Sequence, residues 1–129
     1  MTVNEYLSKQ EPERKELLSS IHELILKTNK KVKPEVGKMM GGDMIQYKIN
    51  TTFAYGLAGQ KNHMTLHLLP MYMHKPIHEK YSGLFKKAAF QKGCINFKNA
   101  DEMPLDITAQ LLTDCAKIDL EAILAKRKK

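Results

Sequence analysis

The sequence contains little of what usually reveals a function at first sight. It has only two cysteines, Cys94 and Cys115, and they do not form a CxxC pair. No run of about 20 apolar residues is present, which a helix would need to cross a bilayer. The first residues, MTVNEYLSKQ, lack the apolar stretch of a signal peptide. These absences predict a cytoplasmic protein with reduced thiols and no membrane association.

Catalytic fingerprints are also missing. Gly41 and Gly42 do not belong to a GxxxxGK[ST] phosphate loop, and we expect them at a bulge or tight bend instead. No dinucleotide motif is present, and no two carboxylates have the spacing of a general acid and base. The sequence therefore predicts a non-enzymatic binding protein, whose partner is another protein, a small ligand or a metal.

Arginine is scarce, although the formal net charge is +7. Arg14 and Arg127 are the two arginines, and lysines cluster at residues 30–38 and 126–129. Arginine makes the bidentate contacts typical of nucleic-acid recognition, whereas lysine acts as a point charge. We therefore interpret the lysines as solvated surface and residues 126–129 as a basic tail, with a polyanion or nucleic-acid binder as an alternative.

The clearest positive signal is the alternation of apolar residues between positions 39 and 70. A period of two over three consecutive runs predicts three antiparallel strands that share one buried face. The apolar residues are Ile45, Tyr47, Ile49, Phe53, Tyr55, Leu57, Met64, Leu66 and Leu68. Because opposite residues share a face, we expect Ile49 opposite Phe53 across the loop of residues 50–52, and Leu57 opposite Met64.

Helical spacing of apolar residues appears before and after these strands. The expected helices are residues 3–7, 12–28, 76–88 and 106–122, and a fourth strand is expected at residues 94–98. Cys115 lies on the apolar stripe of the last helix, and residues 71–73 are expected in a loop. The pattern predicts an α+β fold with an antiparallel sheet of about four to five strands and an N-terminal, a middle and a C-terminal helix. A chain of 129 residues fits a single domain over residues 1–129.

The residues between the apolar positions are small on the middle strand and polar on its neighbours. They predict a shallow trough on the outward face of the sheet, with open space above Gly56. The candidate ligand-binding residues on this face are Lys48, Gly56, Thr65, His67, Cys94 and Asn96. If the strands of Cys94 and His67 are neighbours and a third group orients the histidine, nucleophilic catalysis becomes possible. A cysteine-dependent enzyme is therefore an open alternative.

Metal binding has a separate candidate on the first long helix. Glu13, Glu16 and Glu23 lie on its exposed side, and carboxylates of this kind bind cations. His63 and His67 have the HxxxH spacing of a zinc pair, but four residues of a strand span about 13 Å. That distance is too long for one zinc ion, so the glutamates are the metal candidates.

Four stretches of the chain resemble a known family. They are TVNEYLSKQEPERKELLSSIHELI, VGKMMGGDMIQYK, FAYGLAGQKNHMTLHLLPM and KGCINFKNADEMPLDI. In this order they resemble the YdhG-like family, a bacterial domain of unknown function, over most of the chain. The resemblance implies an α+β fold with an antiparallel sheet and helices. One member has been regarded as a frataxin-like iron chaperone, so iron is the cofactor, and iron delivery the specific function, that the resemblance implies.

Overall fold

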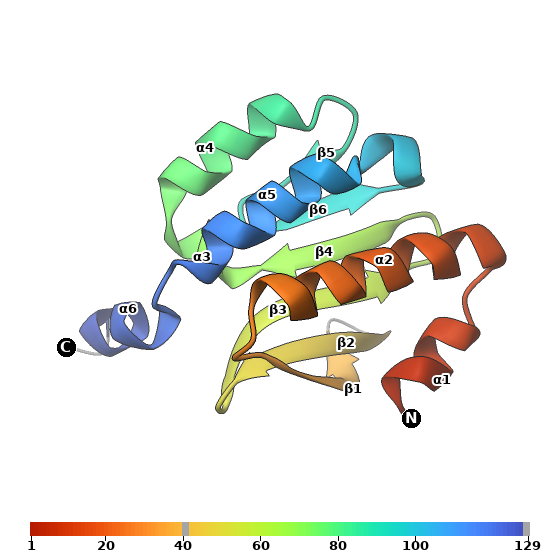
Figure 1. The fold of residues 1–129 in the computed structure, drawn as a ribbon, viewed down its shortest axis with the longest axis horizontal. Coiled ribbons are helices and arrows are strands. Elements are labelled where there is room, and N and C mark those ends of the chain that lie inside the picture. The colour runs from red at the N-terminus through yellow and green to blue at the C-terminus, as the bar shows by residue number, and fades with distance from the viewer. Residues whose placement is uncertain (40–41, 128–129) are drawn as a thin grey trace.

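A computed structural model describes residues 1–39 and 42–127 (Figure 1). The helices are α1 (Val3–Ser8), α2 (Pro12–Thr28), α3 (Leu69–Met73), α4 (Lys75–Leu84), α5 (Leu105–Ala116) and α6 (Leu120–Arg127), and η1 (Ala100–Glu102) is a 3-10 turn. The strands are β1 (Lys33–Met39), β2 (Gly42–Ile49), β3 (Thr52–Gly59), β4 (Met64–Leu68), β5 (Ala89–Phe90) and β6 (Cys94–Phe97). The fold is α+β, as the sequence predicts.

The strands form one antiparallel sheet in the order β1-β2-β3-β4-β6-β5. The sheet has six strands, which is more than the four to five expected from the sequence. The additional ones are its two edges, β1 and β5. Strand β1 contains Pro34, and a proline is tolerated at an edge because one side of an edge strand has no ladder to break.

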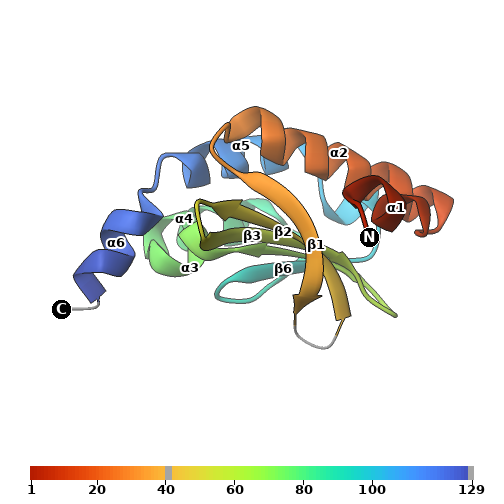
Figure 2. The same cartoon turned by 90° about the horizontal axis from the view of Figure 1, so that it is seen from below.

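Helices cover one side of this sheet. In Figure 2, α1, α2 and α5 lie together on the upper side, over the strands. We call this side the helix face and the opposite side the outer face. Side chains of the helix face form the core with the helices, and they include Ile45, Tyr47, Tyr55, Leu57, Leu66, Leu68, Ile95 and Phe97, all at most 1% exposed.

The first hairpin differs from the expected register near its turn. Ile45 lies opposite Leu57 and Tyr47 opposite Tyr55, but the register then shifts by one residue, and Ile49 pairs with Thr52. The loop therefore contains two residues, of which Asn50 has a φ of 56°, a conformation that asparagine tolerates. The expected pairing of Ile49 with Phe53 across residues 50–52 is wrong.

The second hairpin is shifted by two residues. Leu57 lies opposite Leu66, not opposite Met64 as expected, and Met64 pairs with Gly59. Because side chains alternate with a period of two, a shift of two keeps every residue on the face expected for it. The turn is correspondingly longer than predicted.

Three further expectations change in the helical segments. Residues 71–73 belong to helix α3 rather than to a loop, and Met71 in it is buried. The expected helix of residues 106–122 is two helices, α5 and α6, separated at residues 117–119. Of the predicted tail, Lys126 and Arg127 belong to α6, whereas residues 128–129, like Gly41, lie outside the described residues. Cys115 is buried on α5, as expected.

No helix in the described parts of the chain has both the length and the apolar character that crossing a membrane requires.

Candidate functional site

The register places several of the candidate residues in one row across the outer face. Gln46 on β2 lies opposite Gly56 on β3, and Gly56 lies opposite His67 on β4. His67 in turn lies opposite Cys94 on β6. Residues that lie opposite each other share a face, so the side chains of His67 and Cys94 are direct neighbours although 27 positions separate them.

A second row runs beside the first. Ala58 lies opposite Thr65, and Thr65 lies opposite Asn96. The Thr65 hydroxyl donates a hydrogen bond to Asn96 Oδ1 at 2.8 Å, and Thr65 is only 4% exposed. The side chains of Thr65 and Asn96 are therefore hydrogen-bond partners. They link β4 to β6 beside the row of His67 and Cys94.

Lys48 occupies another part of the outer face. It lies opposite Phe53 at the hairpin end of β2, and its Nζ is 2.5 Å from Glu35 Oε1 on β1. The partly exposed pair contributes little to stability. Strands β3 and β4 separate Lys48 from Cys94, so these two predicted site residues do not act on one small ligand.

The space above Gly56 is filled, which corrects the prediction of an open trough there. A Cβ atom added to Gly56 would lie 2.5 Å from Met44 Sδ and 3.0 Å from the Phe53 ring. Phe53 reaches this face because of the register shift in the first hairpin, which also leaves Ala54 in the core. The space above Gly56 is thus occupied by side chains of the same sheet and is not open to a ligand.

Burial controls the protonation of both neighbours in the row. Cys94 and His67 are each half-buried. Desolvation raises the pKa of the Cys94 thiol, and Cys94 Sγ donates a hydrogen bond to Gln91 Oε1 at 3.0 Å. Desolvation lowers the pKa of His67. At neutral pH the pair is therefore a protonated thiol beside a neutral imidazole.

This protonation is unfavourable for nucleophilic catalysis. A catalytic cysteine needs a thiolate, which a positively charged environment stabilises, whereas burial of Cys94 stabilises the thiol. Metal binding has a different requirement, because a metal ion itself displaces the thiol proton and binds neutral imidazole directly. The pair is thus better suited to hold a metal than to attack a substrate.

The three glutamates on α2 are exposed and do not gather around one point. Glu16 and Glu23 are seven residues apart, which is about 10.5 Å along a helix axis. Within residues 1–39 and 42–127, no three side chains of His, Cys, Asp or Glu form a group that could hold a metal ion. Glu13, Glu16 and Glu23 therefore do not form a shared site.

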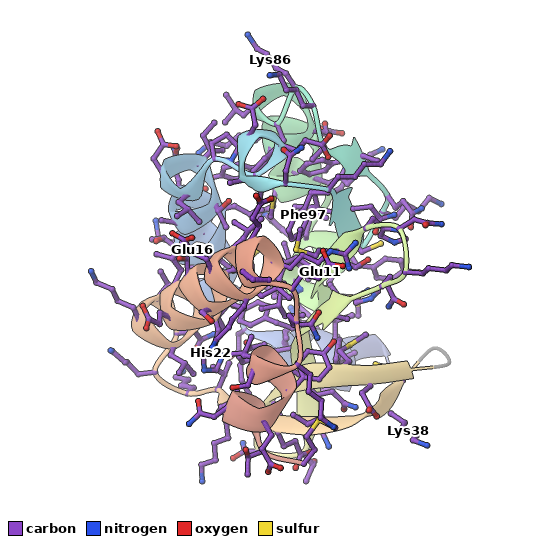
Figure 3. All side chains as sticks on the ribbon, turned by 90° about the vertical axis from the view of Figure 1, so that its right-hand side faces the viewer. Glu11, Glu16, His22, Lys38, Lys86 and Phe97 are labelled. Carbon is purple, nitrogen blue, oxygen red and sulfur yellow. The ribbon has the colours of Figure 1, made fainter. Side chains whose placement is uncertain are left out.

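Glu13 and Glu16 instead line the rim of a cleft of about 590 Å³. The cleft lies between the start of α2 and the segment that joins β6 to α5, and Figure 3 shows Glu11 and Glu16 at this end of α2. Leu17, Met64 and Leu105 supply apolar surface to it. The volume is within the range of small-molecule sites.

Sequence reasoning did not single out Met44. This residue is 0% exposed and belongs to the outer face, where its Sδ lies over Gly56. The alternation of Met44 with Ile45, and its position two residues before Gln46, could have assigned it to this face. No local pattern in the sequence indicated that β4 and β6 are neighbouring strands.

Comparisons with protein-family models, with curated proteins and with solved structures found no match to this chain. The resemblance to the YdhG-like family therefore stays an expectation from the sequence.

Proposed function

We propose that this protein is a non-enzymatic binding protein that holds a metal ion on the outer face of its sheet and transfers it to another protein. The observation that carries the proposal is the pairing of His67 with Cys94 on neighbouring strands. Directly opposite residues have Cβ atoms about 4.5 to 5.5 Å apart, a separation that lets a thiolate and an imidazole bind one ion between them.

Transfer of the metal ion to a partner is favoured because the pair supplies only two protein ligands. Two protein ligands leave coordination positions for water or for the side chain of a partner, so the ion can leave by ligand exchange. Both ligands are half-buried rather than enclosed. We place this function in the cytoplasm, where free thiols such as Cys94 stay reduced.

The proposal moves the metal site away from the residues that a frataxin-like iron chaperone would use. Iron delivery by Glu13, Glu16 and Glu23 is less well supported because these carboxylates do not converge. A cysteine-dependent enzyme is less well supported because burial raises the pKa of Cys94. Polyanion binding lacks the arginines that favour it.

The direct test is an anaerobic titration with Co²⁺, which substitutes for Fe²⁺ and Zn²⁺ and gives a charge-transfer absorption when a thiolate binds it. We expect this absorption in the unaltered protein and its loss in Cys94→Ala. His67→Gln should weaken the binding. Matched controls are Cys115→Ala and His63→Gln, which alter a buried cysteine on α5 and a histidine outside the row. Absorption that survives in Cys94→Ala would remove the proposed site.

The cleft beside α2 supports a second candidate function, the binding of a small organic ligand. Its lining combines apolar surface with four carboxylates, Glu11, Glu13, Glu16 and Asp101, against two cations, Arg14 and Lys98. The excess of negative charge suits a ligand with a positive charge. A thermal-shift screen of small amines tests this candidate. Hits should disappear in Ser20→Phe, which fills the cleft from a half-buried position. A screen without hits, or hits that Ser20→Phe leaves unchanged, would count against it.

A further inference from the structure

A pocket of about 450 Å³ lies where helices α3 and α4 meet the turn between β5 and β6. The described residues that line it are Met71, Tyr72, Lys75, His78 and Lys92. Its volume is within the range of sites for one small molecule, so the side chains that line it can reach the same bound ligand. Among the described residues, none lines both this pocket and the cleft beside α2.

The charge of this pocket is positive. Lys75 and Lys92 line it, and none of its described lining residues carries a carboxylate. Glu79 lies one helical turn after Lys75, but its carboxylate is 3.9 Å from Lys75 Nζ and both side chains are exposed. Such a pair is weak, so Lys75 can exchange it for a ligand. Because lysine is a compact point charge that binds phosphate groups, the pocket favours an anionic group.

Tyr72 supplies the pocket with an exposed aromatic ring. Tyr72 is 54% exposed, whereas the other four tyrosines of the chain are buried. Its ring packs against Gly93: a Cβ atom added to Gly93 would lie 3.3 Å from Tyr72 Cδ2 and 3.5 Å from Tyr72 Cγ. This packing positions the ring and leaves part of its surface free, on which a planar group can stack.

Hydrogen bonds fix the turn that carries Lys92. His78 Nε2 on α4 lies 3.0 Å from the carbonyl oxygen of Gln91. A carbonyl oxygen only accepts, so Nε2 carries the proton and donates it to this bond. On the other side of Lys92, the Gly93 carbonyl oxygen accepts a hydrogen bond from Leu68 N at 2.8 Å. Lys92 thus lies between two anchored residues, and the pocket is formed before a ligand binds.

We propose that this pocket binds a small ligand that has both a planar ring and a phosphate group, as a nucleoside monophosphate has. Lys75 and Lys92 hold the phosphate, and the base stacks on Tyr72. The volume is larger than a phosphate ion needs, and the exposed ring offers a surface to the rest of the ligand. The site goes beyond the proposed function and does not depend on it, because neither His67 nor Cys94 is among its described lining residues.

The test is a titration of the full chain with adenosine monophosphate, followed in the backbone amide NMR spectrum. Adenosine and inorganic phosphate are titrated in parallel because they carry the two parts separately, and a short single-stranded RNA is the fourth probe. Adenosine monophosphate should bind at least about 10-fold more tightly than adenosine or phosphate, since linking the parts raises their effective concentration. The largest shifts should occur at Tyr72, His78 and Gly93.

Matched variants test the ring and the charge separately. Tyr72→Leu removes the stacking surface and should weaken binding of adenosine monophosphate about 5-fold or more, whereas Tyr72→Phe keeps the ring and should bind as the unaltered protein does. Lys92→Gln should weaken binding about 3- to 10-fold. Its control is Lys38→Gln, which removes the same charge from an exposed lysine on β1, at the opposite edge of the sheet (Figure 3). The amide spectrum of each variant also shows whether it is folded.

Three results would overturn the proposal. Adenosine monophosphate that binds no more tightly than inorganic phosphate would leave the ring without a role. Equal losses in Lys92→Gln and Lys38→Gln would mean that the net charge of +7 attracts the ligand without a site. Binding of the RNA without binding of adenosine monophosphate would assign this surface to a nucleic acid. Each of these results leaves the proposed function untouched, because that function is tested at Cys94.

Discussion

The two faces of the sheet come from the same strands, yet they differ in how far their side chains are buried. In the core beside the helix face, buried hydroxyls have fixed partners: Tyr47 pairs with His22 Nδ1 at 2.6 Å, and Tyr55 accepts a hydrogen bond from Asn29 Nδ2 at 3.2 Å. On the outer face, His67 and Cys94 are half-buried neighbours. The comparison teaches that the helix face supplies the core, whereas the outer face keeps side chains with nitrogen and sulfur atoms accessible to solvent.

The largest expected effect separates two neighbouring residues of β4. Leu66 is 0% exposed on the helix face, so Leu66→Ala should lower the free energy of unfolding by about 2 to 5 kcal/mol. His67→Ala, on the outer face, should cost about 1 kcal/mol or less. Urea unfolding of both variants measures the difference. Equal losses would mean that both faces are core and that the outer face has no separate role.

A smaller effect is expected where the outer face is filled by its own side chains. Gly56→Ala forces Met44 Sδ and the Phe53 ring to move, and overpacking of this kind costs about 1 to 3 kcal/mol. The control is Gly83→Ala in α4, where an added Cβ has no neighbour within 4 Å. That change should stabilise the helix by up to about 1 kcal/mol. If Gly56→Ala unfolds at the same temperature as the unaltered protein, the trough is open after all.

The smallest effect concerns an ion pair beside the core and depends on pH. The Tyr81 hydroxyl donates a hydrogen bond to Asp114 Oδ2 at 2.5 Å, and this bond, together with Lys80, lowers the pKa of Asp114. A carboxyl group whose pKa is lower in the folded protein than in the unfolded chain stabilises the fold at pH values above its pKa in the unfolded chain. This contribution is lost as the pH falls through its pKa in the folded protein.

Asp114→Asn should therefore cost about 1 kcal/mol at neutral pH, the net contribution of a typical hydrogen bond. The difference from the unaltered protein should vanish in acid, below the folded pKa of Asp114. Denaturant midpoints at several pH values test this expectation. A difference that stays constant down to the lowest pH would mean that the carboxylate charge contributes nothing.

Alternation is a local property, so it predicted the face of most strand residues. It was wrong for Phe53 and Ala54, whose faces are exchanged by the register shift in the first hairpin. Ile45, Tyr47 and Leu66 could be assigned to the buried side without knowledge of strand order. Edge strand β1 was missed because Pro34 and Gly37 are poor strand formers, and their positions in an edge strand are tolerated only in the context of β2.

The candidate site could be predicted only in part. Thr65, His67, Cys94 and Asn96 were assigned to one face from alternation. The adjacency of His67 and Cys94 could not be, because α3, α4 and β5 lie between their strands in the chain and no local pattern encodes that pairing. The shift in the first hairpin, which brings Phe53 over Gly56, depends on turn geometry at Asn50.

The most direct test of the proposed metal site is a backbone amide NMR spectrum recorded while Zn²⁺ is added to the isotope-labelled protein without oxygen. Zn²⁺ is diamagnetic, so shifted signals report its position. The account predicts that the largest shifts occur at Gly56, His67 and Cys94, on three neighbouring strands. Shifts confined to α2, around Glu13 and Glu16, would contradict it, as would a spectrum that Zn²⁺ leaves unchanged.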